Sequence, residues 1–138
     1  MIIDALGLLR ADGTSPTITA TEAGYTLLTR HAATGKVVLD IRKTPQKGLP
    51  IVVVSTLVGI TNRSFVVTIE AANELAFDTT KEVVATFPAV AVTGLAFMVR
   101  RIHTQKQYIR SVITVTDGGG PAGTGDFLIY IGHALMNT

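Results

Sequence analysis

Three histidines, His31, His103 and His133, are the side chains of this chain best suited to bind a transition metal or to transfer a proton. Zinc sites are usually built from ligands at short, regular spacings on one helix or strand. No two of these histidines have such a spacing, and none stands beside a pair of carboxylates. The spacing therefore predicts two loop histidines and one at a strand end, with no metal and no cofactor.

A glycine-rich segment from Gly118 to Gly123 formally satisfies the G-x-G-x-x-G pattern of dinucleotide-binding proteins. Such a site needs a strand before the glycines and a helix after them, so that the pyrophosphate meets the helix N-terminus. Here Pro121 interrupts the pattern, and Thr124-Gly125-Asp126 leads into another β-rich run. We therefore predict a hairpin loop at this segment.

Residues for nucleophilic or acid–base catalysis are not arranged in a known pattern. The chain has no G-x-S-x-G motif, which would hold a serine beside a base. Glu70 and Glu74 are the nearest candidates for the paired carboxylates of a glycosidase, and we interpret them as solvated edge residues. The sequence predicts no catalytic residue, and we expect the chain not to be an enzyme.

The one local concentration of basic residues lies late in the chain and surrounds a single tyrosine, Tyr108. On a strand, neighbouring residues point to opposite faces, so its basic side chains do not form the continuous stripe that nucleic-acid binding needs. One aromatic ring is also too few for a stacking platform. We expect no nucleic-acid binding and interpret this region as a solvated or partner-facing strand edge; its basic members are Arg100, Arg101, His103, Lys106 and Arg110.

The elements that must position these residues are short β-runs separated by Gly, Pro, Asn and Asp. Val, Ile and Thr supply 47 of the 138 residues, and these β-branched side chains pack well on a pleated surface. Only residues 71–81 have room for a helical turn. Counting one or two weaker strands within 17–29, we predict an all-β jelly-roll β-sandwich of about eight antiparallel strands. The other predicted strands are 36–42, 51–57, 64–71, 82–87, 95–101, 108–116 and 127–134.

Composition limits the class of protein. Apolar residues make up 47% of the chain and charged residues 16%, with a net charge of +2 and no cysteine. That apolar fraction excludes a disordered, charged tail and indicates one domain over residues 1–138 with some apolar surface kept for a partner. No apolar stretch reaches the roughly 20 residues of a membrane span, and the first residues make a poor signal peptide, so we expect neither membrane insertion nor export.

The order of several motifs resembles the small capsid cement (decoration) proteins of tailed bacteriophages, of the type described for Bordetella phage. Each motif alone is weak, and their order over nearly the whole chain carries the resemblance. In chain order they are Met1-Ile2-Ile3-Asp4, a Thr- and Ala-rich stretch over 17–26, Gly48-Leu49-Pro50-Ile51-Val52-Val53-Val54, Thr104-Gln105-Lys106-Gln107-Tyr108-Ile109-Arg110, and Gly123-Thr124-Gly125-Asp126-Phe127-Leu128-Ile129.

This resemblance implies a non-enzymatic virion protein on the outer surface of the capsid. Such a protein binds the major capsid protein, staples neighbouring capsomers, stabilises the shell, and assembles with itself, with a dimer favoured and a trimer as the alternative. Residues 1–12 are the candidate docking arm, since apolar side chains there would bury against the shell or a sister subunit; the equal alternative is a first edge strand. The interface candidates are Ile2, Ile3, Asp4, Leu6, Leu8, Arg100, Arg101, Tyr108 and Arg110.

Two other functions stay open at this point. One is a β-sandwich that recognises carbohydrate or a host surface in a phage tail or fibre, although the absence of Trp and the presence of only three Tyr argue against an aromatic sugar platform. The other is an enzyme with a cupin-like metal site on a jelly roll, which stoichiometric metal in protein purified without chelator would support.

Overall fold

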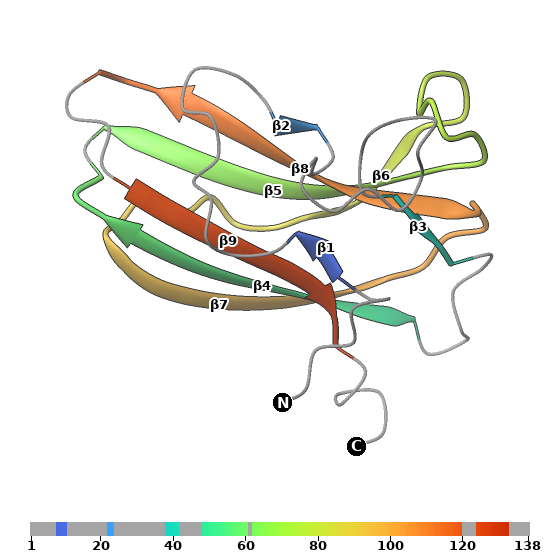
Figure 1. Cartoon of the computed structure of the whole chain (residues 1–138), viewed down its shortest axis with the longest axis horizontal. Coiled ribbons are helices and arrows are strands. Elements are labelled where there is room, and N and C mark those ends of the chain that lie inside the picture. The colour runs from blue at the N-terminus through green and yellow to red at the C-terminus, as the bar shows by residue number, and fades with distance from the viewer. Residues whose placement is uncertain are drawn as a thin grey trace.

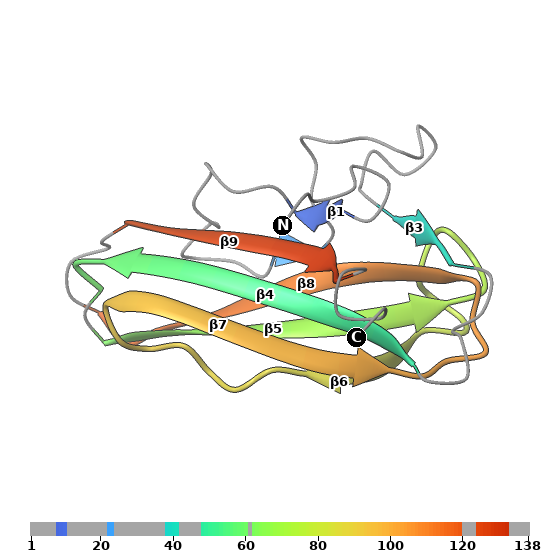
Figure 2. The same cartoon turned by 90° about the horizontal axis from the view of Figure 1, so that it is seen from below.

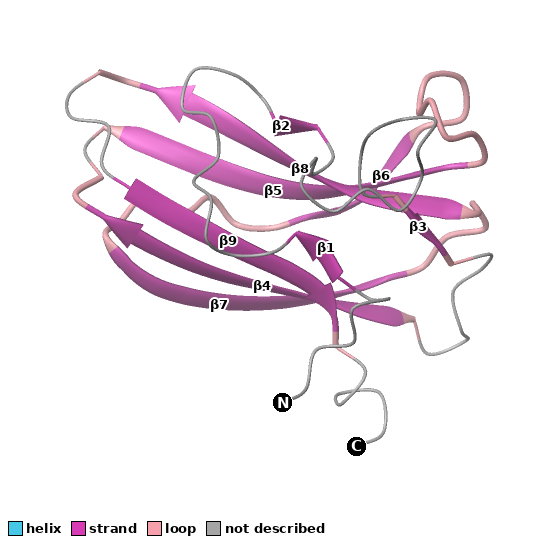
Figure 3. Cartoon of the chain, viewed as in Figure 1, coloured by secondary structure: helices cyan, strands magenta, loops and turns pink. Residues whose placement is uncertain are grey.

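The computed structural model describes residues 8–10, 22–23, 38–41, 48–60, 62–119 and 124–132. These residues form nine strands and no helix, arranged as two antiparallel sheets that pack face to face (Figures 1 and 3). The predicted all-β sandwich is confirmed. Within the same residues, no helix is long and apolar enough to cross a membrane.

The first sheet has four strands in the spatial order β1-β9-β4-β7. They are β1 (Leu8–Arg10), β9 (Thr124–Ile131), β4 (Leu49–Val58) and β7 (Gly94–Ile102). The second sheet has five strands in the order β2-β8-β5-β6, with β3 also paired to β8. They are β2 (Glu22–Ala23), β8 (Tyr108–Asp117), β5 (Arg63–Ala72), β6 (Glu82–Thr86) and β3 (Leu39–Asp40).

The strand order is that of a jelly roll. β2 pairs with Val112 and Ile113 of β8, whereas β3 pairs with Tyr108 and Ile109, so these two short strands share one edge position. The sandwich therefore has eight strand positions, four in each sheet, as two interlocked Greek keys require. This confirms the predicted jelly roll of about eight antiparallel strands.

The core lies between the sheets and follows from the two-residue period of the strands. Phe65, Val67 and Ile69 of β5 point inward, as predicted, and each is at most 3% exposed. Phe127 of β9 reaches them from the opposite sheet, and its ring centroid lies 5.5 Å from that of Phe65. This aromatic contact ties the two layers together in the first halves of β5 and β9.

Two local predictions differ from the structure. The glycine-rich segment is not a hairpin, because β8 and β9 do not pair with each other but lie in opposite sheets. It therefore carries the chain from one layer to the other; Gly118 and Gly119 are described, and the rest of the segment lies outside the described residues. The predicted strand over 36–42 is represented among the described residues by β3, which is two residues long.

Candidate interaction surface

Strand β7 runs along one open side of the sandwich (Figure 2). In the part of the chain that the structure describes, it pairs with β4 alone, in a continuous register from Gly94↔Leu57 to Ile102↔Leu49. Its other edge is the end of the first sheet. The strand is thus held rigidly by β4 while one row of backbone groups faces outward, which is the geometry of a template for a further strand.

Large apolar side chains line the outer face of β7. Leu95 is 74% exposed, Phe97 is 59% exposed and Val99 is 41% exposed. They alternate with Ala96 and Met98, which are half-buried and pack against the core. On the neighbouring strand, by contrast, Val52 lies opposite Val99 and is fully buried. Toward the start of β7 the exposed row extends onto the neighbouring strand, where Thr56 lies opposite Leu95 and is exposed and Val58 is 57% exposed.

An open hollow of about 270 Å³ lies beside this row, where the chain rises from the second sheet into β7. Its floor is fixed, because Val90 and Phe65 exchange backbone hydrogen bonds of 2.9 Å. Val92, on its rim, is 77% exposed. The walls are mainly small or apolar; the lining residues are Ala89, Val90, Ala91, Val92, Thr93, Gly94, Leu95, Ala96 and Met98.

We call Val92, Leu95, Phe97, Met98 and Val99 the β7 surface. Soluble proteins usually protect a sheet edge with charges, prolines or a covering element, and contiguous exposed apolar patches mark contact sites for other molecules. Residues 94–99 carry no charge. This surface therefore has the properties of a protein-binding edge: an unpaired strand for backbone hydrogen bonds and apolar side chains for specificity.

Two interface candidates from the sequence, Arg100 and Arg101, lie at the end of β7 and are exposed. Arg100 stands opposite Ile51 and Arg101 opposite Pro50 on β4, so successive side chains point to opposite faces, as predicted. The β7 surface and these two arginines therefore form one continuous strand edge, apolar along most of its length and cationic at one end.

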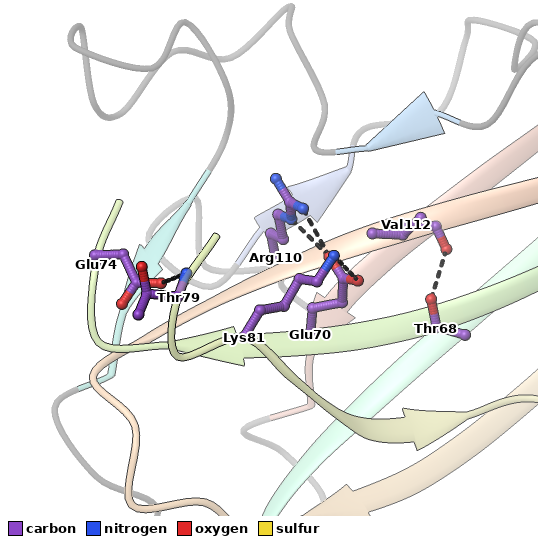
Figure 4. A network of polar contacts seen from close by, with 7 residues as sticks. All are labelled: Thr68, Glu70, Glu74, Thr79, Lys81, Arg110 and Val112. Atoms are coloured by element: carbon purple, nitrogen blue, oxygen red, sulfur yellow. Dashed lines mark hydrogen bonds and ion pairs between the residues drawn. The ribbon is translucent and has the colours of Figure 1, made fainter. Parts of the chain in front are cut away.

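The other two described candidates on the basic segment, Tyr108 and Arg110, lie in the second sheet on β8. The structure does not bring them together with the β7 surface. Tyr108 packs against the small apolar cluster that contains Phe77. Arg110 binds Glu70 (Figure 4). It also lies over the Phe77 ring, with its guanidinium carbon 4.4 Å from the ring centroid. Both side chains thus make contacts that hold the second sheet together.

The candidate docking arm is described only over β1. Leu8 is half-buried and pairs with Tyr130, and Leu9 is fully buried in the core. Arg10 is also fully buried and donates a 2.7 Å hydrogen bond from Nη1 to the carbonyl of Phe127. These three residues form an edge strand, the alternative reading of this segment. The other arm candidates, Ile2, Ile3, Asp4 and Leu6, lie outside the described residues.

Of the two glutamates considered for catalysis, Glu70 is not a solvated edge residue, so that interpretation was wrong for Glu70; Glu74 is partly exposed in the turn after β5. Glu70 is buried, with Arg110 Nη2 2.8 Å from one carboxylate oxygen and Lys81 Nζ 3.7 Å from the other (Figure 4). A strand residue that faces outward can still be shielded from solvent when a long basic side chain, here that of Arg110, lies across it.

Glu74 closes the turn after β5. It accepts hydrogen bonds from the Thr80 hydroxyl and, at 2.8 Å, from the Thr80 backbone N–H. It accepts another from the backbone N–H of Thr79 at 2.9 Å (Figure 4). The hydroxyl bond first, and then the backbone bonds, lower the pKa of Glu74 below its ordinary value of 4.5, against a smaller opposing effect of desolvation. The arrangement stabilises a turn.

The histidines give no metal cluster among the described residues, where no group of three or more His, Asp or Glu side chains converges. His103 is exposed on the loop between β7 and β8. His31 and His133 lie outside the described residues.

Sequence reasoning missed the β7 surface. The run Leu95-Ala96-Phe97-Met98-Val99 would place apolar side chains on both faces of a strand, and from this pattern we predict only the strand. An apolar run on both faces indicates either a strand covered on both sides or an edge whose outer face is kept for a partner. The exposed fractions identify the second case. No family model, curated protein or solved structure matches this chain, so the surface is argued from its own geometry.

Proposed function

We propose that this chain is a non-enzymatic capsid cement protein of a tailed bacteriophage, which binds the major capsid protein on the outside of the shell and staples neighbouring capsomers. The jelly roll agrees with the fold that the motif resemblance implies. The observation that carries the proposal is the β7 surface, an exposed apolar edge on a rigid strand. Such an edge is suited to permanent contact with other protein surfaces.

A rigid sandwich suits this task for thermodynamic reasons. A protein that binds the assembled lattice better than separate capsomers stabilises the lattice by mass action. Two modest contacts on neighbouring capsomers act together through their high effective concentration. A flexible bridge would lose part of that gain to ordering entropy, whereas the core around Phe65 and Phe127 fixes the distance between contact surfaces.

Cosedimentation with capsids of the phage that encodes the chain tests the proposal. The full chain is mixed with assembled shells and, separately, with unassembled capsid protein, and both are centrifuged under conditions in which only shells pellet. We expect saturable binding to shells, little binding to unassembled capsid protein, and a higher temperature of shell disruption when the chain is bound. Absence of binding to shells at tens of micromolar protein overturns the proposal.

A further inference from the structure

We propose that a second copy of this chain binds the β7 surface, with the two β7 strands pairing antiparallel about a two-fold axis at Phe97. The inference rests on the proposed function and deepens it, because it names the partner of this surface. A dimer built in this way carries two copies of every surface that stays exposed outside the β7 surface. It thereby supplies the bivalence that stapling requires.

The backbone of β7 permits this pairing. In an antiparallel pair, two residues that lie opposite each other either both point their N–H and C=O groups toward the partner strand or both point them away. When a strand pairs with its own copy, the two-fold axis therefore passes beside a residue that lies opposite the same residue of the copy. Outer-face side chains then meet outer-face side chains, and the first sheet continues from one copy into the other. Within the described residues no strand pairs with this edge of β7, and Leu95 beside it is 74% exposed.

A two-fold axis at Phe97 matches the side chains by size. On the outer face, Leu95 lies opposite Val99 of the second copy, and the two Phe97 rings adjoin each other. On the inner face, Ala96 lies opposite Met98 of the second copy. The hollow lined by Ala96 and Gly94 is thus positioned to receive that methionine, which is unbranched and fits irregular apolar gaps. On the inner face a large residue therefore meets a small one beside an open space, and on the outer face large apolar side chains meet one another.

The charges favour the same register. Arg100 lies opposite Gly94 of the second copy, where a glycine with open space around it leaves room for a long side chain. The two Arg100 residues are six residues apart along the paired strands, or about 20 Å. That is more than a Debye length at physiological salt, so their repulsion is screened. An axis at Met98 would instead place the arginines on the apolar row, opposite Leu95 and Ala96, and a parallel pairing would place like charges side by side.

The exposed area is sufficient for a dimer of moderate affinity. Val92, Leu95 and Phe97 are each more than half exposed. With Val99, Met98 and the hollow, these side chains make a contact patch no larger than the roughly 800 Å² per partner of a standard stable interface. We therefore expect a reversible dimer with a dissociation constant in the micromolar range.

Cysteine cross-linking tests the register directly, because the chain contains no cysteine. Phe97→Cys places two thiols opposite each other, at a Cβ separation of about 5 Å. A short thiol–thiol cross-linker should therefore give a covalent dimer in high yield at micromolar protein. The matched control is Val83→Cys, on β6 of the other sheet, since Val83 is 57% exposed and Phe97 is 59% exposed. Equal cross-linking of the two variants overturns the proposal.

Sedimentation equilibrium tests the affinity. Phe97→Lys brings two like charges together at the two-fold axis and should raise the dimer dissociation constant at least 30-fold. Val83→Lys should change it less than threefold, because this residue lies on the other sheet and opposite Glu70. Circular dichroism establishes that both variants keep the β-sheet spectrum. A wild-type chain that stays monomeric at several hundred micromolar overturns the inference.

These outcomes separate the inference from the proposed function. A chain that binds shells but sediments as a monomer retains the function and refutes the β7 dimer. A dimer that cross-links through Phe97→Cys but never binds shells retains the dimer and refutes the function. A monomeric wild-type chain whose shell binding is abolished by Phe97→Lys assigns the β7 surface to the capsid protein instead of to a second copy.

Discussion

Arg110 and Glu70 form an ionic contact across the second sheet: the guanidinium Nε and Nη2 atoms both lie 2.8 Å from one carboxylate oxygen. The two residues stand directly opposite each other on β8 and β5. The guanidinium also lies over the ring of Phe77, in the turn region after β5. One side chain thus joins two strands and the adjoining turn, and so stabilises the face away from β7.

Replacing Arg110 by Ala should lower the free energy of unfolding by about 2–4 kcal/mol, because a buried carboxylate loses its principal partner. Lys81, with its Nζ 3.7 Å from the second Glu70 oxygen, is too far for an optimal hydrogen bond and compensates little. Urea-induced unfolding measures the loss. Arg100→Ala is the control: this arginine is exposed, and its removal should change the free energy of unfolding by less than about 0.5 kcal/mol. Equal losses from the two variants would mean that the Glu70 contact contributes little.

Substitution of two phenylalanines, one in the core and one on the β7 surface, should have very different effects on stability. Phe127 is fully buried against Phe65, so Phe127→Ala should destabilise the fold by about 3–5 kcal/mol by leaving a cavity. Phe97→Ala removes the same atoms from an exposed site and should cost less than about 1 kcal/mol in the monomer. Thermal unfolding at concentrations below the dimer dissociation constant measures both. A large loss from Phe97→Ala under those conditions would show that the ring supports the monomer core.

Much of the fold was predictable because strands have a simple period. β5 and β8 largely alternate apolar and polar residues, with exceptions such as Val66 and Ser111. This pattern predicts Phe65, Val67 and Ile69 inward, as the structure has them. The ends of β4, β5, β6, β7 and β8 lie within two residues of the predicted ones. Gly94 and the proline after β6 mark two of these limits, since each interrupts a regular strand.

What the sequence left undetermined depends on contacts between distant residues. Alternation turns Glu70 outward and so predicts a solvated side chain, yet Arg110 covers it from 40 residues away. Short loops usually join paired strands, so the glycine-rich segment between β8 and β9 predicts a hairpin. In the structure this segment instead crosses from one sheet to the other. Alternation also cannot say which apolar strand becomes an edge. That is why Leu95, Phe97 and Val99 were missed.

The crossing between the sheets begins at Gly118, whose N–H donates a 2.7 Å hydrogen bond to the carbonyl of Asn62. A Cβ at this position would lie 2.5 Å from that same backbone oxygen, which is not free to move aside. Gly118→Ala should therefore destabilise the fold by about 1–3 kcal/mol, as overpacking generally does. Thr116→Ala, at an exposed position on β8, is the control and should be nearly neutral. Urea unfolding of the two variants checks this, and a neutral Gly118→Ala would show that the crossing tolerates displacement.

The turn closed by Glu74 should respond to pH. Its carboxylate has a pKa below the ordinary value of 4.5, so its stabilising contribution is fully present above pH 4.5 and is lost as the pH falls through the folded-state pKa. Thr80→Val removes the hydroxyl that contributes most, and should raise the pKa of Glu74 toward 4.5 in an NMR titration of its carboxyl group. Thr79→Val is the matched control, since that hydroxyl bonds to Asp78. The same pKa in both variants would contradict the assigned cause.

Binding to capsid shells by the wild-type chain, Phe97→Lys and Val83→Lys, compared in one cosedimentation series, tests the central claim most directly. A chain that staples capsomers as a β7-linked dimer should bind shells tightly, and loss of bivalence in Phe97→Lys should weaken the apparent affinity by about 100-fold or more. Val83→Lys, with its charge on the other sheet, should bind like the wild type. Equal binding by all three would show that the β7 surface has no part in attachment, and the absence of binding by the wild-type chain would contradict the account as a whole.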